Sequence, residues 1–132
     1  MIVTYTEKQI DGIWSRVAPF IETALGRGSI WNIEDIYDGL KESTFQLWAW
    51  KDDGIEAVLI TCLVKDKYCV MLTMAGSKMD EWIKCLPIVE NWARQNGCKE
   101  MMVHGRKGWS RVLKYPIVRR DELGLYVMEK QL

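Results

Sequence analysis

The sequence predicts a single α+β domain, residues 1–132, built on a mixed, mostly antiparallel sheet of about six strands with helices on both faces. Three observations lead to this class. Apolar residues recur at helical spacing near the N-terminus and again in the second half of the chain. Three strand patterns follow one another between these helices, which indicates an antiparallel meander. A later strand–helix–strand step indicates a parallel crossover.

The composition is that of one globular domain. The chain has 132 residues, of which 48% are hydrophobic and 27% charged, a length that suits one core and is too short for two domains. No apolar stretch approaches the roughly 20 residues of a membrane-spanning helix. Residues 1–5 lack the basic and apolar regions of a secretory signal. We therefore expect a cytoplasmic protein with no membrane role.

The cysteines and the single histidine show no metal-binding pattern. Cys62, Cys69, Cys85 and Cys98 lack C-x-x-C spacing, and His104 is not paired with any of them at metal-ligand spacing. Three of the four cysteines lie among apolar neighbours, where a free cysteine packs as a small hydrophobe. We expect buried, reduced thiols and no metal cofactor.

A short strand and a long helix are predicted at the N-terminus. The strand covers residues 2–5, and Thr6 with Gln9 follows the capping-box pattern of a helix start. Pro19 is expected to kink the helix or divide it, and Gly26 and Gly28 are expected to end it. Residues three and four positions apart form its apolar stripe: Ile10, Ile13, Trp14, Val17, Ile21 and Leu25.

A second helix and the meander follow. Asn32 is a suitable N-cap for a helix over residues 33–42. Alternation over 45–51 predicts a strand with Trp48 and Trp50 on one face, where they either pack under a helix or form an exposed aromatic pair. The hairpin signal Asp52-Asp53-Gly54 leads to a nearly unbroken apolar run, 55–64, typical of a central strand. A turn at 65–67 precedes a further strand over 68–74.

The last third alternates helices and strands. A third helix starts at Met79, is expected to bend at Pro87, and stops at Asn96-Gly97. Its stripe includes Trp82, which, like Trp14, is most simply a core residue. A strand over 99–104, a short helix over 109–114 and a closing strand over 124–129 complete the chain.

Charge is distributed unevenly, although the net charge is zero. Between Lys99 and Arg120 there are seven basic residues and one acid, Glu100, so this segment is net +6 and the rest of the chain net −6. Such a segment suggests an anionic ligand or partner. Pairing of a solvated basic face with the acidic remainder explains the pattern equally well.

The order of elements is similar to the GNAT N-acetyltransferase fold over nearly the whole chain. It also resembles small GNAT-like proteins of bacteriophages and prophages. Two segments support the resemblance: W-A-R-Q-N-G-C at 92–98, entering a strand, and G-R-K-G-W at 105–109, leaving it. In GNAT enzymes a helix ending in A-x-x-x-G leads into the fifth strand in the same way. The resemblance implies transfer of an acyl group from acetyl-CoA, a CoA thioester, to an amine acceptor.

The resemblance also implies a cofactor site after the fourth strand. GNAT enzymes bind acetyl-CoA there through the pattern Q/R-x-x-G-x-G/A, because glycines let backbone amides approach the pyrophosphate and the helix N-terminus adds a favourable field. The matching junction has one glycine and no leading Arg or Gln; Ser77 in it alternatively predicts an ordinary helix cap. Its residues are Met74, Ala75, Gly76, Ser77 and Lys78.

A second family pattern follows the fifth strand, where an Asn contacts the cofactor and a Tyr seven residues later acts as general acid. Arg106 and Leu113 stand at these positions, so neither residue matches. Tyr115 and Tyr126 are the nearby hydroxyls of the right type. Basic contacts to the cofactor are expected from the segment that contains Arg106, Lys107, Gly108 and Arg111.

Acyl transfer also requires a group that removes a proton from the attacking amine. The candidates are Glu56, in the third strand, and His104, at the end of the fifth, because imidazole exchanges protons near neutral pH. A structural or merely exposed histidine is the alternative.

The departures at both cofactor motifs favour a second hypothesis. This is a GNAT-like protein without catalysis that acts as a phage or prophage structural, assembly or host-interaction factor, bound to a protein partner or to further copies of itself. Binding of nucleic acid is the third hypothesis for the function. Trp109 beside Arg106 and Arg111 suits base stacking, but the pI lies below neutrality and no nucleic-acid motif is present.

Overall fold

The computed structural model describes residues 1–26, 31–64 and 66–132. These residues form two compact units. The first unit comprises Met1–Cys62 and Thr73–Cys85, and the second comprises Leu63–Leu72 and Leu86–Leu132. The predicted helix-ending Gly28 and the predicted turn residue Lys65 lie outside the described residues.

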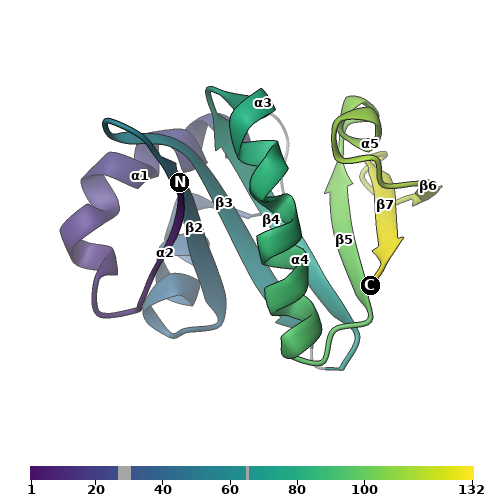
Figure 1. Cartoon of the computed structure of the whole chain (residues 1–132), viewed down its shortest axis with the longest axis horizontal. Helices are drawn as coiled ribbons and strands as arrows, with labels where there is room; N and C mark the ends of the chain where they lie inside the picture. Colours follow the sequence, from purple (N-terminus) through teal and green to yellow (C-terminus); the bar gives the residue numbers. More distant parts are fainter. Residues whose placement is uncertain (27–30, 65) are drawn as a thin grey trace. The chain divides into compact units, whose positions relative to one another are not determined.

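Seven strands form one sheet in the order β1-β2-β3-β4-β5-β7-β6 (Figure 1). Strands β4 and β5 pair in parallel, whereas the pairs β1–β2, β2–β3, β5–β7 and β7–β6 are antiparallel. The mixed, mostly antiparallel sheet is therefore confirmed. The strands are β1 (Ile2–Tyr5), β2 (Phe45–Lys51), β3 (Ile55–Val64), β4 (Tyr68–Gly76), β5 (Glu100–Gly105), β6 (Ile117–Arg120) and β7 (Tyr126–Gln131).

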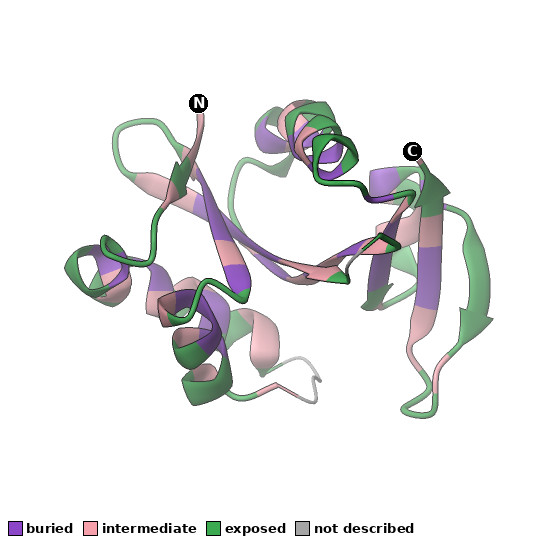
Figure 2. Ribbon diagram, turned by 90° about the horizontal axis from the view of Figure 1, so that it is seen from below, coloured by how far each residue is buried: buried purple, intermediate pink, exposed green. Residues whose placement is uncertain are grey.

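The sheet agrees with the expected mixed architecture of about six strands, and residues 117–120 form β6, a seventh strand that local patterning does not predict. All four residues of β6 are exposed (Figure 2). Its sequence, two apolar residues followed by two arginines, also lacks the alternation of apolar and polar positions that marks a half-buried strand. Pairing with β7 makes this segment a strand, with an irregularity in the register between Ile117 and Arg119.

The helices are α1 (Ile10–Leu25), α2 (Ile33–Lys41), α3 (Met79–Trp82), α4 (Leu86–Gln95) and α5 (Gly108–Leu113), with a 3₁₀ turn, η1, at Ile83–Cys85. Pro19 lies inside α1 without dividing it. The predicted third helix is interrupted at η1, and Pro87 stands in the first turn of α4, where its missing N–H leaves no helical bond unmade.

In the first unit, one stripe of α1 is buried, consisting of Ile10, Ile13, Val17 and Ile21. Helix α2 starts with a capping box between Asn32 and Asp35 and approaches β2 so closely that a side chain at Gly39 would collide with the ring of Phe45. Phe45, at the start of β2, is therefore covered by α2.

The tryptophans of the first unit are packed rather than displayed. Trp48 is 4% exposed, and its Nε1 donates to Thr61 Oγ1 at 3.0 Å. Trp50 is half-buried, so Trp48 and Trp50 form no exposed aromatic pair. Trp82 is buried as expected, whereas Trp14 is half-buried and packs edge-on against Tyr37.

In the second unit, β5 and β7 present two different faces. Cross-strand partners point to the same side of a sheet and successive residues to opposite sides. Met101 pairs with Lys130 on one face, and His104 pairs with Val127 on the other. Helix α4 packs on the Lys130 face, because its Glu90 contacts the Lys130 ammonium. The His104 face is therefore the side of β5 and β7 opposite α4.

The four cysteines, all within the described part of the chain, are not joined by disulfide bonds. Cys69 and Cys98 are buried as expected, whereas Cys62 and Cys85 are half-buried. Burial raises the pKa of the Cys62 and Cys98 thiols. Among the described residues there is no cluster of three or more metal-ligating side chains. Over the same residues, every helix is too short or too polar to cross a bilayer.

Candidate functional site

The turn between β4 and α3, in the first unit, is held against β3. Met74 is buried within β4, and Ala75 follows it in the same strand. Gly76 has a φ of +134°, and any side chain there would meet the β3 backbone. The Ser77 amide donates to the Glu56 carbonyl at 2.8 Å. The glycine is thus required by the close approach of two chain segments, and an amide expected to face a phosphate is already bonded.

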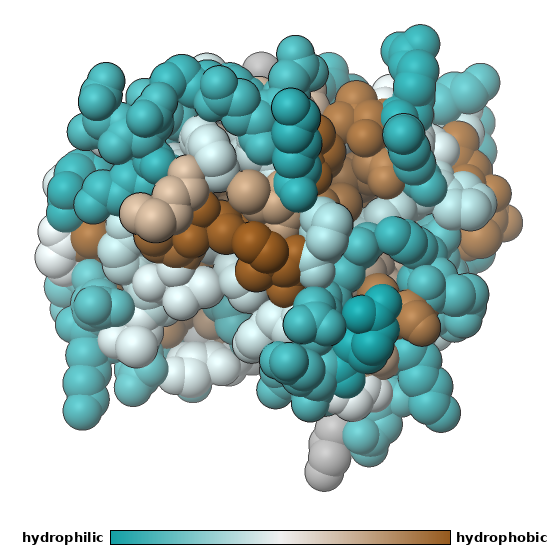
Figure 3. Space-filling view, in the orientation of Figure 1, coloured by the Kyte–Doolittle hydropathy of each residue, from teal (hydrophilic) through white to brown (hydrophobic). Residues whose placement is uncertain are grey.

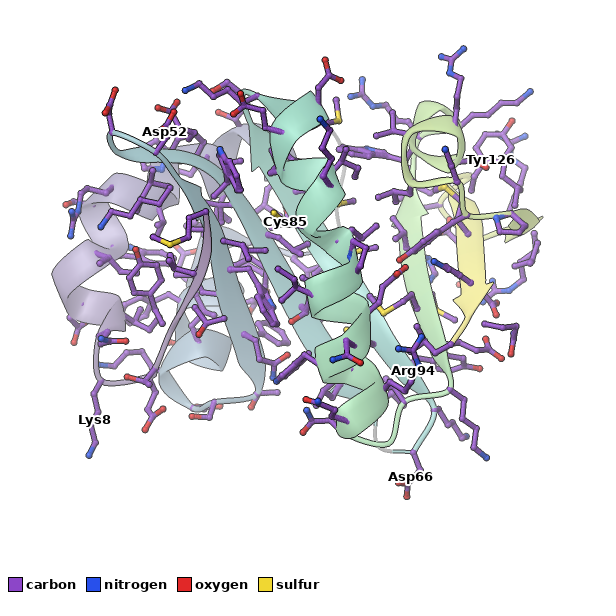
Figure 4. All side chains as sticks on the ribbon, viewed as in Figure 1. Lys8, Asp52, Asp66, Cys85, Arg94 and Tyr126 are labelled. Atoms are coloured by element: carbon purple, nitrogen blue, oxygen red, sulfur yellow. The ribbon has the colours of Figure 1, made fainter. Side chains whose placement is uncertain are left out.

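Two carboxylates face the Lys78 ammonium at this turn. Lys78 Nζ lies 2.8 Å from Asp52 Oδ2 and 3.8 Å from Glu56 Oε1, and Ser77 Oγ lies 3.3 Å from Glu56 Oε2. The bond with Asp52, labelled in Figure 4, raises the pKa of Lys78 and lowers that of Asp52. Three predicted site residues, Glu56, Ser77 and Lys78, are therefore together. Two carboxylates beside an occupied amide do not fit a pyrophosphate, because they repel its negative charge.

The basic residues around α5, in the second unit, have a different environment. Arg106, Lys107 and Arg111 are exposed, and no described carboxylate pairs with them. Gly108 begins the helix, and hydrophilic side chains project from the surface over α5 (Figure 3). Unpaired cations attract anions, and guanidinium groups match phosphate oxygens in shape. This group fits a phosphate-bearing ligand.

His104 is bound to a carboxylate that the β6–β7 turn holds in place. Its Nδ1 lies 2.8 Å from Asp121 Oδ2. Asp121 Oδ1 accepts the backbone N–H groups of Leu123 and Leu125, at 2.9 and 3.0 Å. The His104 side chain is 35% exposed and that of Asp121 only 15%. The imidazole therefore reaches solvent while its partner is largely covered.

Tyr115, a predicted acid, lies in the interior of the second unit. It is 1% exposed, and its hydroxyl donates to Glu90 Oε2 at 2.6 Å. Burial, and then the bond to Glu90, raise the pKa of Tyr115. Glu90 is 6% exposed and also accepts a bond from Lys130 at 3.1 Å. In this arrangement the hydroxyl proton of Tyr115 stays on the phenol and is directed at Glu90.

Tyr126, the other predicted acid, packs under a cation. The guanidinium carbon of Arg120 lies 4.7 Å from the centre of its ring, and Figure 4 labels the residue on β7. Tyr126 pairs with Gly105 and therefore points to the face opposite His104. Within the second unit, His104 is thus joined to Asp121 and separated from both tyrosines.

No family model and no curated protein matches the sequence, but solved acetyltransferase structures match it over the full chain. One is a GNAT family acetyltransferase from Elizabethkingia anophelis with acetyl-CoA bound, at 12% identity and a TM-score of 0.73, covering 100% of this chain and 97% of that one. Another is the PaiA N-acetyltransferase of Thermoplasma acidophilum in complex with coenzyme A, at 12% identity, TM-score 0.69, and 100% and 98% coverage. This chain has a GNAT fold.

The IAA acetyltransferase of Bacillus cereus shares the GNAT fold, at 12% identity, a TM-score of 0.71, and coverage of 100% of this chain and 99% of that one. Aminoglycoside 6'-acetyltransferase type Ii also shares it, at 11% identity, a TM-score of 0.69, and 99% and 96% coverage. The names of these proteins differ in acceptor, so the GNAT fold by itself does not identify an acceptor. Two of these neighbours are described with coenzyme A or acetyl-CoA bound. In this chain the basic residues around α5 fit the phosphates of coenzyme A, and the turn after β4 does not.

Sequence reasoning missed Asp121, Asp52 and Glu90. Asp121 opens the D-E-L-G turn between β6 and β7, and an Asp with a Gly three residues later is a turn signal that could have predicted this hairpin. Asp52 belongs to a predicted hairpin, but its contact with Lys78 spans 26 residues of chain. Glu90 occupies a helical position that spacing alone cannot distinguish from an exposed one.

Proposed function

We propose that the chain is an acyl-CoA-dependent N-acyltransferase that uses His104 as its general base. The observation that carries the proposal is the His104 imidazole, bonded to Asp121 and open to solvent, in a fold shared with acetyltransferases that hold acetyl-CoA or coenzyme A. A positioned base contributes roughly 10²- to 10⁴-fold to a proton-transfer step. The acceptor class in this proposal is a primary or secondary amine.

The residues of the chain have separate tasks in this proposal. A bound CoA thioester supplies the activated acyl group. His104 would accept the proton that the amine nitrogen releases as its bond to the acyl carbon forms and the bond from that carbon to the sulfur of coenzyme A breaks. Water or the solvent-open imidazolium would give a proton to the departing thiolate, so that coenzyme A leaves as the thiol. Asp121 would offset the positive charge on the imidazolium. Arg106, Lys107 and Arg111 bind the phosphates of the cofactor, because they are exposed cations without acidic partners among the described residues.

The other predicted site residues receive no task in this scheme. Ser77 and Lys78 are engaged by Glu56 and Asp52, and Tyr115 donates its hydroxyl to Glu90. Glu56 as a base and Tyr126 as an acid stay predictions, each testable by substitution once an acceptor is known.

Calorimetric titration of acetyl-CoA and coenzyme A into the purified chain tests the proposal. We expect saturable binding that weakens with added salt, because phosphate contacts to exposed cations are screened. An exposed ion pair contributes up to about 1 kcal/mol, or about fivefold in Kd. Arg106→Glu with Arg111→Glu removes two such contacts, together up to about 25-fold in Kd, and adds two repulsive charges, so we expect binding to weaken by about tenfold or more. Lys8→Glu, at an exposed lysine of the first unit (Figure 4), is the matched control and should leave Kd unchanged.

A second candidate function has its own supporting observation, the closed turn after β4. The bonded Ser77 amide and the carboxylates of Asp52 and Glu56 suit a GNAT-like protein that binds another protein instead of a cofactor. A phage or prophage assembly or host-interaction factor belongs to this class. A correctly folded chain that binds neither acetyl-CoA nor coenzyme A at millimolar concentration would favour this candidate and overturn the first.

A further inference from the structure

We propose that Asp121 is the positioning residue of the base: it holds His104 as the Nδ1–H tautomer, so that Nε2 is the nitrogen that takes up a proton. The geometry rests on contacts within the second unit alone. Its catalytic meaning rests on the proposed function.

The direction of the hydrogen bond follows from the other contacts of Asp121. The bond from His104, and then the backbone amides of Leu125 and Leu123, lower the pKa of Asp121, which is therefore a carboxylate at neutral pH. An ionised carboxylate accepts hydrogen bonds and cannot donate one. With Nδ1 at 2.8 Å from Asp121 Oδ2, the hydrogen between them belongs to Nδ1. A neutral imidazole carries one hydrogen on its two nitrogens, so Nε2 keeps its lone pair.

Hydrogen bonds within the β6–β7 hairpin hold the Asp121 carboxylate in place without any ligand. The Asp121 amide donates to the Leu125 carbonyl at 2.8 Å, and the Gly124 amide donates to the Asp121 carbonyl at 3.0 Å. Gly124 has a φ of +83°, a conformation that glycine adopts without strain. Backbone and side chain of Asp121 are thus both held by the turn. A positioned partner of this kind lowers the cost of orienting the imidazole in each catalytic cycle.

The sheet register explains how β6 brings Asp121 to His104. Val127 of β7 pairs with His104 of β5 on one side and with Arg119 of β6 on the other. The three side chains therefore share one face, and the chain reaches Asp121 two residues after Arg119. Strand β6 thus places a carboxylate beside the end of β5, across the intervening strand.

Two other charged groups lie near His104 on this face. Glu129, on β7, is close enough to His104 and Arg119 that both favour its ionised form, although its bond with Glu100 raises its pKa more strongly. Arg119, on β6, carries the opposite charge. Among the described residues, Asp121 is the hydrogen-bond partner of His104. Glu129 and Arg119 therefore adjust the field around the imidazole, and Asp121 sets its tautomer.

Nitrogen-15 NMR of the imidazole tests the tautomer, and the single histidine of the chain makes the signals unambiguous. At a pH where the ring is neutral, we expect a protonated Nδ1 and an unprotonated Nε2. Asp121→Asn should reverse this pattern. The amide oxygen still accepts the Leu123 and Leu125 N–H groups, while the amide NH₂ points at Nδ1 and requires a lone pair there. Native protein with the proton on Nε2, or a variant with an unchanged pattern, would overturn the proposal.

An acyl-transfer assay with a panel of primary amines, in which the released coenzyme A is measured, tests whether Asp121 positions His104 for catalysis. Asp121→Asn should lower kcat/KM by roughly 10²- to 10⁴-fold near neutral pH, because the wrong tautomer cannot accept the proton at Nε2. Glu122→Gln is the matched control: it removes one negative charge from the neighbouring exposed position and should retain native activity. Equal activity of Asp121→Asn and native protein would overturn the positioning role.

The two proposals fail in different ways. A native chain that shows the Nδ1–H pattern but transfers no acyl group and binds no coenzyme A would sink the proposed function while the tautomer assignment stands. An active native chain whose imidazole carries its proton on Nε2 would leave the acyltransferase in place and remove Asp121 as its positioning residue. Far-UV circular dichroism of each variant confirms that it is folded.

Discussion

Removal of the Tyr115 hydroxyl should destabilise the second unit and leave acyl transfer unchanged. Tyr115→Phe deletes one oxygen atom, whose buried bond to Glu90 is 2.6 Å long. A hydrogen bond to a charged group contributes roughly 1.5–3 kcal/mol. The variant leaves Lys130 as the remaining side-chain partner of Glu90 shown by the structure. The Lys130 side chain is 44% exposed and that of Glu90 only 8%, so solvent can replace the ammonium more easily than it can replace the buried hydroxyl. We therefore expect the free energy of unfolding to fall by about 2 kcal/mol.

Urea unfolding followed by far-UV circular dichroism measures this loss from the midpoint and slope of the transition. Lys130→Met is the matched variant, because it removes the other side-chain partner of Glu90. It should cost less than Tyr115→Phe, because water can replace the partly exposed ammonium. A Tyr115→Phe protein that unfolds within about 0.5 kcal/mol of the native chain, or a Lys130→Met protein that is the less stable of the two, would refute the structural role. Loss of acyl transfer in correctly folded Tyr115→Phe would assign Tyr115 as the general acid.

Three further outcomes are expected from the described contacts. Gly76→Ala should lower the free energy of unfolding by about 3 kcal/mol, because a side chain there meets the β3 backbone at a φ of +134°; urea titration against Gly54→Ala, which meets nothing within 4 Å, checks this. Trp48→Phe should cost roughly 1–2 kcal/mol by the same assay, because the buried bond to Thr61 is lost. The lowered pKa of Asp121 contributes stability above its unfolded-state pKa, about 3.9, and this contribution disappears as pH falls through the lower folded-state value. Asp121→Asn should accordingly lose less stability than the native chain on acid titration below about pH 4.

Local patterns predict β2 and β3 with the observed bounds, because the Asp52-Asp53-Gly54 turn separates them and the apolar run from Ile55 is continuous. Helix α2 is predicted almost as well, since Asn32 provides a side-chain cap that the structure contains. The start of α1 is less accurate. Gln9 accepts the Thr6 amide as a capping box requires, but the helix begins only at Ile10 because residues 7–9 form turns. Elements with both a periodic core and a local boundary signal are thus the ones that sequence predicts.

The site is less accessible to sequence reasoning than the fold. His104 is recognisable as a candidate from its residue type and its place at the end of a strand. Asp121 is not, because 17 residues separate the pair and the contact depends on a strand, β6, whose exposed residues have no periodic signal. Tyr115 illustrates the converse. Its phenol suits acid chemistry, but burial against Glu90 is a property of packing that no local motif reveals.

The turn after β4 also bears on protein engineering, for anyone who would graft a phosphate-binding loop onto this scaffold. Replacing Asp52 and Glu56 by neutral residues would remove the electrostatic repulsion, but the bond between the Ser77 amide and the Glu56 carbonyl is made by backbone atoms and survives any exchange of side chains. Gly76 is already committed to the contact with β3, so it is not free to open the loop. Inserting residues between Gly76 and Lys78, rather than exchanging those present, is therefore the change that would release an amide toward solvent.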